Sequence, residues 1–195
     1  MITGMMKTIK SLASAALLLF VITGNVYSKD SMLDSILNKL SSIKQRSESF
    51  TEVKLLNVLQ SQVELEGTLE FYAPERLIKV TQNPVYEVLD VSKNSISIQK
   101  GDNEAEELLI TDYPLLAAFV EAYRGMLSGN KNKLFQYYQV ETKGDLNNWT
   151  ISLFPIDDEV VEYLEKIIFE GQQAFIKKII TVEASSDKSI MYIKH

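Results

Sequence analysis

A run of strictly alternating apolar and polar residues restricts the fold of this chain more than any other feature. Val63, Leu65, Gly67, Leu69 and Phe71 alternate with residues that are mostly acidic. A period of two places the apolar set on one face of a β-strand and the polar set on the other. The chain therefore requires a sheet with one covered apolar face and one solvated acidic face.

Similar short segments recur along the chain, separated by turn-forming residues such as Gly, Asn and Pro. Short strands that follow one another through tight turns are typical of an antiparallel meander. The predicted strands are 50–60, 63–72, 76–82, 86–91, 95–99, 107–111, 135–141, 149–154, 166–170, 176–184 and 189–194.

Three segments have a helical pattern instead. Residues 31–46 have one apolar stripe and Asp30 or Ser31 as the expected cap, and residues 155–164 form a short helix opened by aspartates. The segment from Tyr113-Pro114 to Ser128-Gly129 is apolar nearly all round, so we expect it to be buried on more than one side. The predicted fold is α+β: one strongly curved antiparallel sheet, a half-open barrel, with helices covering its concave face.

The first 28 residues have the pattern of an export signal. Lys7 and Lys10 precede an apolar run from Leu12 to Ile22, and Val26 and Ser28 fit a small-x-small cleavage pattern. An uncleaved membrane anchor is the alternative, but the apolar run is shorter than the ~20 residues that a spanning helix needs. We therefore expect cleavage after Ser28 and a single soluble domain of residues 29–195 in the periplasm.

Composition narrows the possible partners. The chain has no cysteine, so neither a disulfide nor a lipid-modified cysteine is available. Its net charge is −6, and removing the signal takes two lysines away. An acidic surface repels phosphate backbones, which argues against a nucleic-acid partner.

Catalytic chemistry has little support in the sequence. The only histidine is His195, the final residue, where we expect mobility rather than a Ser-His-acid triad or a transition-metal site. A glycan-cleaving site built from a pair of carboxylates is the remaining enzymatic possibility. Most carboxylates, however, fall on the predicted solvated faces. We predict no catalytic residue, no metal and no cofactor.

Two stretches carry a family resemblance. Phe71-Tyr72-Ala73-Pro74-Glu75-Arg76-Leu77-Ile78-Lys79 is similar to a Tyr-x-Ala-Pro-x-Arg-Leu-x-Lys motif, and Trp149-Thr150-Ile151-Ser152-Leu153-Phe154-Pro155 to a Trp-x-Leu-x-Leu-x-Pro motif. Both motifs occur in the LolA-like superfamily of periplasmic carriers of outer-membrane lipoproteins, and the first in its LolA-related branch. The resemblance implies a non-catalytic carrier of acyl chains.

The chain departs from this pattern at Ala73. The general lipoprotein carrier has an arginine there, immediately before the proline, and Arg76 lies after the proline and is not its equivalent. The resemblance therefore implies a specialised relative, of the kind that accompanies the export of lipids and aryl polyenes.

The carrier hypothesis predicts an apolar cavity between the curved sheet and the 113–129 helix. Its lining would also serve as ordinary core, which is the simpler interpretation of each residue. Arg76 and Lys79 are expected at the rim, where they would meet a headgroup or a partner. The predicted lining residues are Val63, Leu65, Leu69, Leu77, Ile78, Val88, Ile96, Leu116, Phe119, Val120, Tyr123 and Leu127.

Three functions follow in order of preference. The first is a monomeric carrier that takes acyl chains of a lipid or lipoprotein from an inner-membrane exporter or release complex to an outer-membrane acceptor. The second is an interaction module that docks on an exporter or receptor through an exposed edge strand. The third is an enzyme acting on envelope lipid or glycan.

Overall fold

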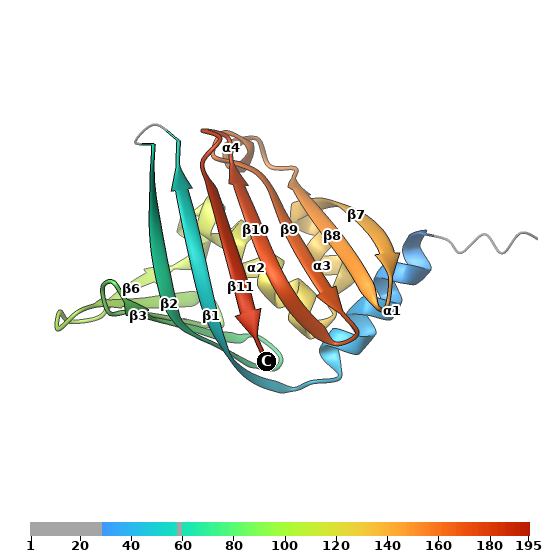
Figure 1. Ribbon diagram of the computed structural model, residues 1–195, viewed down its shortest axis with the longest axis horizontal. Helices are drawn as coiled ribbons and strands as arrows, with labels where there is room; N and C mark the ends of the chain where they lie inside the picture. Colours follow the sequence, from blue (N-terminus) through green and yellow to red (C-terminus); the bar gives the residue numbers. More distant parts are fainter. Residues whose placement is uncertain (1–28, 58–59) are drawn as a thin grey trace, which may run out of the picture.

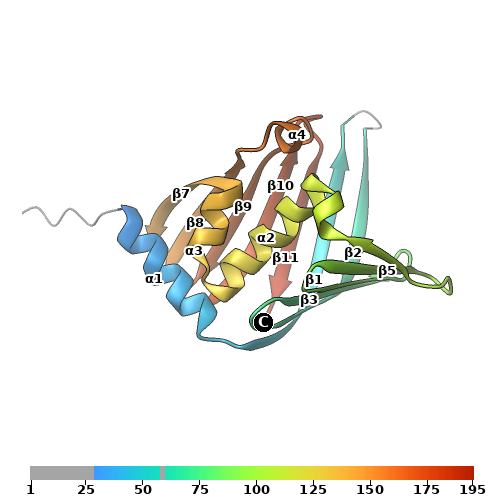
Figure 2. The ribbon, with the colours of Figure 1, turned by 180° about the vertical axis from the view of Figure 1, so that it is seen from behind.

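The computed structural model describes residues 29–57 and 60–195, so the predicted signal peptide lies outside the described residues. These residues form one 11-stranded antiparallel sheet that curves strongly but does not close, and helices lie on its concave side (Figures 1 and 2). The predicted fold class is confirmed. No helix within the described ranges is both long and apolar enough to cross a membrane.

The strands agree with the predicted series apart from their ends. Before the central helix they are β1 (Gln45–Leu56), β2 (Ser61–Tyr72), β3 (Arg76–Asn83), β4 (Glu87–Ser92), β5 (Ser95–Lys100) and β6 (Glu106–Leu109). After it they are β7 (Tyr138–Asp145), β8 (Asn148–Pro155), β9 (Leu164–Gln172), β10 (Phe175–Glu183) and β11 (Lys188–Lys194).

The central helix α2 (Pro114–Ser128) confirms the prediction at both ends. Pro114 occupies its first turn, where the missing N–H costs nothing. Gly129 ends it in the left-handed region, with φ of 72°, and its N–H donates to the carbonyl of Gly125. A short 3-10 helix, η1 (Ile110–Asp112), precedes α2 and includes the last two residues of the predicted strand 107–111.

One predicted strand is partly wrong. Helix α3 (Lys131–Tyr137) occupies the start of the segment 135–141. The Asn130 side chain accepts a hydrogen bond from the N–H of Lys133 and caps this helix, and Leu134 is fully buried. A short apolar run does not distinguish a helical turn from a strand.

The other two helices are shorter than predicted. Helix α1 (Lys29–Ser41) ends earlier because β1 already begins at Gln45, and it starts before both expected caps. Helix α4 (Asp158–Val161) is a single turn whose N–H groups donate to the Asp157 carboxylate. It ends early because Leu164 starts β9.

The sheet order is β6-β5-β4-β3-β2-β1-β11-β10-β9-β8-β7, so the last strand pairs with the first. β6 and β7 are left as edges. The sheet bends between β2 and β3, where the register shifts at Glu66/Gly67. A Cβ on Gly67 would lie 1.8 Å from the Val80 carbonyl oxygen, so only glycine allows this close approach. Beyond the bend, β3–β6 turn across the body of the molecule (Figure 1).

The concave side has two differently filled regions. In the region we call the packed half, α1 and α3 lie over β7–β9 (Figure 2), and the inward side chains are fully buried. In the region we call the hollow half, α2 faces β1–β5, β10 and β11. The fully buried packed-half residues include Leu40, Leu134, Trp149, Ile151, Leu153 and Phe169.

Candidate binding cavity

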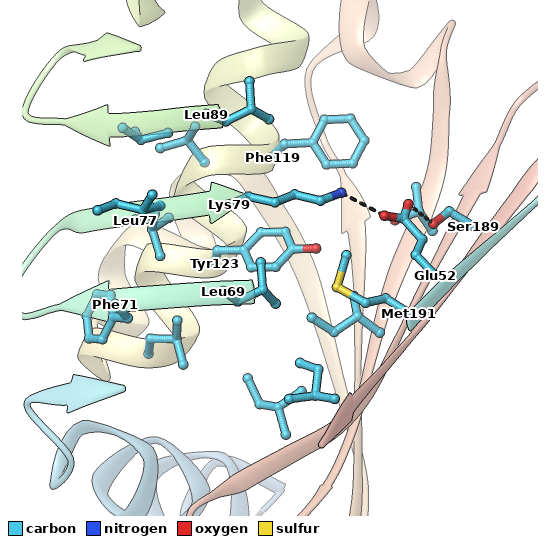
Figure 3. Close-up of a pocket in the computed structure, with 18 of the residues that line it drawn as sticks. Glu52, Leu69, Phe71, Leu77, Lys79, Leu89, Phe119, Tyr123, Ser189 and Met191 are labelled. Carbon is cyan, nitrogen blue, oxygen red and sulfur yellow. Dashed lines mark hydrogen bonds and ion pairs between the residues drawn. The ribbon is translucent and has the colours of Figure 1, made fainter. Parts of the chain in front are cut away.

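The hollow half contains a cavity of about 310 Å³ between α2 and the concave face of the sheet (Figure 3). Strands from both sides of the bend contribute to it: β1–β5 on one side, and β10 and β11 on the other. Its volume is at the lower end of the roughly 300–1,000 Å³ typical of small-molecule sites.

Most of the predicted lining residues border this cavity. Helix α2 supplies residues from successive turns, and the strands supply residues mainly from the inward phase of the pleat. Ile78 is the exception, because it pairs with Glu70 and Asp90 on the outward phase. Their contact with cargo stays a prediction. The predicted residues that border the cavity are Leu69, Leu77, Ile78, Ile96, Leu116, Phe119, Val120, Tyr123 and Leu127, together with Lys79.

Val88 is not among the cavity residues because its strand has the opposite phase from the one predicted. Val88 pairs with Val80, whereas Leu89 pairs with Lys79. Paired residues point to the same face, so Leu89 shares the cavity side with Lys79. Leu89 and Val91 border the cavity in place of Val88. A shift of one residue exchanges the two faces of a strand.

Val63, Leu65 and Arg76 also lie outside the cavity lining. Val63 is 38% exposed, and Leu65 packs against the core. Arg76 pairs across β2–β3 with Tyr72, on the face opposite Leu77. Its guanidinium donates two hydrogen bonds to the Asp90 carboxylate, at 3.1 and 2.7 Å. Arg76 is therefore engaged on the outer face rather than at the cavity rim.

Several lining residues were not predicted. Ile176, Ile179, Met191 and Ile193 complete the apolar wall from β10 and β11. Both strands were expected, but the sequence did not show which of their faces turns inward. The face of β11 that turns inward is set by its pairing with β1, which is distant in sequence. The local residue pattern of β11 carries no information about this pairing.

A charged pair lies within the apolar wall. The Nζ atom of Lys79 on β3 lies 2.6 Å from Oε2 of Glu52 on β1, reaching across the intervening strand (Figure 3). The Ser189 hydroxyl donates to the other carboxylate oxygen at 2.5 Å. The Lys79 ammonium also lies 5.0 Å from the centre of the Phe50 ring.

Glu52 stays ionised despite its position. Burial raises the pKa of its carboxyl, but the charge and hydrogen bond of Lys79, the hydrogen bond from Ser189 and the charge of Lys54 together outweigh burial. The net result is a pKa below the ordinary value. The Glu52 side chain is only 5% exposed, whereas that of Lys79 is 23% exposed. Lys79 is therefore the more accessible member of the pair.

Tyr123 contributes a phenol to the same region. Its ring packs edge-on against Phe169, with centroids 5.5 Å apart, at the border of the packed half. Its hydroxyl points toward Lys79 and Glu52 (Figure 3). Burial, and then the Glu52 charge, raises the pKa of this phenol, so it remains a protonated hydrogen-bond donor.

The two ends of the cavity are polar. Toward the β10–β11 turn, exposed Glu183 and Lys188 join half-exposed Asp187 among the lining residues and form a solvated mouth. Toward the other end lie Arg46 and Glu48.

His195 lies beside that second end and makes several contacts there. Its Nε2 lies 2.8 Å from the Ile176 carbonyl oxygen, and its Nδ1 lies 3.1 Å from the Glu48 carboxylate. Its ring also packs against Phe175. Pairing of β11 with β1 and β10 brings the ring to these partners.

Arg124 contacts the β2–β3 turn, which contains Ala73 at the position where the general lipoprotein carrier has an arginine. Nε of Arg124, on α2, donates to the carbonyl oxygen of Glu75 at 2.7 Å. Arg124 is 7% exposed and also pairs with Glu121 one turn earlier, at 3.4 Å. The central helix is thereby tied to the β2–β3 turn beside the cavity.

Sequence comparison places the protein in a family. Residues 27–191 match the family described as outer membrane lipoprotein carrier protein LolA-like. The chain belongs to this LolA-like family. Members of the LolA-like family are binding and carrier proteins rather than enzymes. No curated protein is significantly similar to the chain in sequence.

Solved structures with a similar arrangement have very different sequences. A LolA superfamily protein from Nitrosomonas europaea is 9% identical, with a TM-score of 0.49 over 86% of this chain and 91% of that one. A DUF1329 family protein from Desulfovibrio piger is 6% identical, with a TM-score of 0.46 over 84% and 89%. The Mycobacterium tuberculosis lipoprotein LppX is 9% identical, with a TM-score of 0.39 over 86% and 95%.

Proposed function

We propose that this protein is a periplasmic carrier that shelters the acyl chains of a lipid or lipoprotein and moves them from the inner toward the outer membrane. The observation that carries the proposal is the cavity in the hollow half, with an apolar wall and a polar mouth. Membership of the LolA-like family supports it.

The energetics suit reversible binding. Each methylene removed from water contributes about 0.8 kcal/mol, so the roughly eleven hydrocarbon carbons of a twelve-carbon acyl chain contribute roughly 9 kcal/mol. Association costs about 4 kcal/mol or more in lost translational and rotational freedom. The surplus is small enough for the cargo to be released to an acceptor.

The proposed cargo belongs to a specialised pathway rather than to general lipoprotein traffic. The turn that carries an arginine in the general carrier has Ala73 here, and Arg124 of α2 donates a hydrogen bond to the Glu75 carbonyl of this turn. A role linked to the export of a lipid or an aryl polyene fits this departure. Neighbouring genes for ketosynthases, acyltransferases and a large exporter would support it.

The test is uptake of a fluorescent fatty acid by the purified mature protein. Phe119→Asp places a charge in the apolar wall and should reduce uptake at least tenfold. Phe135→Asp is the matched control, because Phe135 is 44% exposed on α3 and does not line the cavity. It should take up the probe as the unaltered protein does.

Thermal unfolding of both variants must accompany the binding measurement, since a buried aspartate also destabilises the fold. A folded Phe119→Asp protein with normal uptake would show that this part of α2 does not contact cargo. Unaltered protein that takes up no probe, and carries no lipid in native mass spectrometry after purification from the periplasm, would refute the carrier function.

A second function has one supporting feature. β7 is an eight-residue edge strand and β6 a four-residue one, and each pairs on one side only within the described sheet. An interaction module that docks on an exporter or receptor would use such an edge. Capture of one exporter from inner-membrane extracts by cargo-free protein, together with failed lipid uptake, would favour this function.

A further inference from the structure

The hydroxyl of Tyr123 is a donor without an acceptor. It makes no hydrogen bond to any residue of 29–57 or 60–195, although its pKa is raised by burial and it stays protonated. Tyr123 is half-buried and lines the cavity, and its hydroxyl is not among the buried polar atoms without a partner, so the hydroxyl is open to the cavity and available to a bound molecule. The Tyr123 hydroxyl faces the cavity, where only a bound molecule or water can accept its proton (Figure 3).

Lys79 has spare donors in the same place. An ammonium group has three N–H bonds and no acceptor. One N–H is used by Glu52 Oε2, and the Phe50 ring attracts the charge without forming a conventional hydrogen bond. The ammonium therefore retains donor capacity toward the cavity, which it borders.

Glu52 does not offset these donors with an acceptor for cargo. One of its oxygens accepts from Lys79 and the other from Ser189, and its side chain is nearly fully buried. Free donors from two elements, β3 and α2, therefore face the cavity, whose lining also includes the hydroxyl residues Thr181 and Ser189. Apolar side chains surround them, including Leu69, Phe119 and Met191 (Figure 3).

We propose that Lys79 and Tyr123 form a polar subsite within the cavity that binds the acyl carbonyl or carboxylate oxygen of the cargo. This inference rests on the carrier function proposed above and narrows the class of cargo. The ligand is a fatty acyl compound with an oxygen acceptor at the end of its chain, not a plain hydrocarbon. Its chain lies against the apolar residues beside the subsite.

The test compares three competitors of one chain length against the fluorescent fatty acid: dodecanoic acid, methyl dodecanoate and dodecylamine. The acid and the ester present acceptors, whereas protonated dodecylamine presents only donors and a charge like that of Lys79. The unaltered protein should bind the acid and the ester at least tenfold more tightly than the amine. Tighter binding of the acid than of the ester would identify a free carboxylate as the natural group. Equal binding of acid and ester would identify an esterified chain.

Tyr123→Phe removes only the hydroxyl. It should weaken the binding of acid and ester about three- to tenfold, the usual effect of losing one hydrogen bond. Because the hydroxyl has no partner among the described residues, the melting temperature should not fall. Tyr192→Phe is the control, since Tyr192 is 47% exposed and outside the cavity lining, and it should change neither quantity.

The double variant Glu52→Gln/Lys79→Met removes the ammonium without leaving its carboxylate partner unpaired. It should lose the preference for acid over amine while still binding the ester. If Tyr123→Phe and the double variant both bind all three competitors as the unaltered protein does, the polar subsite is refuted and the carrier function stands. If the unaltered protein binds none of them, the carrier function itself fails.

Discussion

The packed half and the hollow half share one sheet but are filled differently. On β8 and β9 the inward residues are large, apolar and completely buried, as at Trp149 and Phe169. On β3 and β4 the inward residues Leu77, Lys79 and Leu89 remain only partly buried beneath α2. Stability and binding capacity are therefore separated in space.

The difference shows how a small domain without disulfides tolerates a cavity. A dense core in one half supplies the folding free energy, so the other half does not need complete packing. The curved sheet spans both halves, and its bend at Gly67 sets β3–β6 against α2 and away from the packed half.

The largest expected contrast comes from the same substitution in each half. Leu153→Ala, at a fully buried site in the packed half, should lower the free energy of unfolding by about 2–5 kcal/mol. Leu89→Ala, at the cavity wall, should cost only about 1 kcal/mol, because its side chain already borders empty space. Urea unfolding measures both values. Equal losses would mean that the hollow half is as tightly packed as the other.

Breaking the buried ion pair should have the next largest effect. Lys79→Met leaves the Glu52 carboxylate without its main partner and should destabilise the protein by about 2–3 kcal/mol. This is less than the roughly 3–5 kcal/mol of a fully buried pair, because Lys79 is partly exposed. Adding Glu52→Gln should restore stability to within about 1 kcal/mol. A double variant no more stable than Lys79→Met would show that the pair does not act as a unit.

Enlarging a side chain tests the empty space directly. Ile151→Phe in the packed half should cost about 1–3 kcal/mol through overpacking. Leu69→Phe in the hollow half should cost less than about 1 kcal/mol and should reduce fatty-acid uptake by occupying the cavity. A large loss of stability at Leu69 with unchanged uptake would contradict the proposed division.

The smallest effect concerns pH. Because the folded state lowers the pKa of Glu52, its ionised form contributes stability above the ordinary value of 4.5. That contribution is lost as the pH falls from 4.5 through the lower folded-state pKa. Urea unfolding between pH 7 and pH 3 measures this loss of stability. The Glu52→Gln variant should lose less stability over this range, and an identical pH dependence would count against the ionised pair.

The fold could be predicted because its signals are local. The alternation along β2 and the apolar helix after Pro114 each appear in a few consecutive residues, and they gave the sheet, the covering helix and much of the cavity wall. Helix α3 escaped prediction because its apolar run is too short to show a period and depends on the cap at Asn130 and the packing of Leu134.

The polar part of the cavity could not be predicted for a different reason. Within residues 52–55 of β1 the inward phase contains Glu52 and Lys54, while the outward phase contains Val53 and Leu55. Local hydrophobicity therefore favours the wrong face. Pairing of β1 with the distant β11, together with the bend between β2 and β3, turns Glu52 toward Lys79.

Photo-crosslinking with a diazirine fatty acid, followed by peptide mapping, tests most directly whether the hollow half holds acyl chains. The account predicts adducts on cavity residues such as Leu69, Phe119 and Tyr123, competed away by unlabelled fatty acid, and none in the packed half. Adducts confined to exposed residues such as Phe135, or no adducts that unlabelled fatty acid displaces, would contradict it.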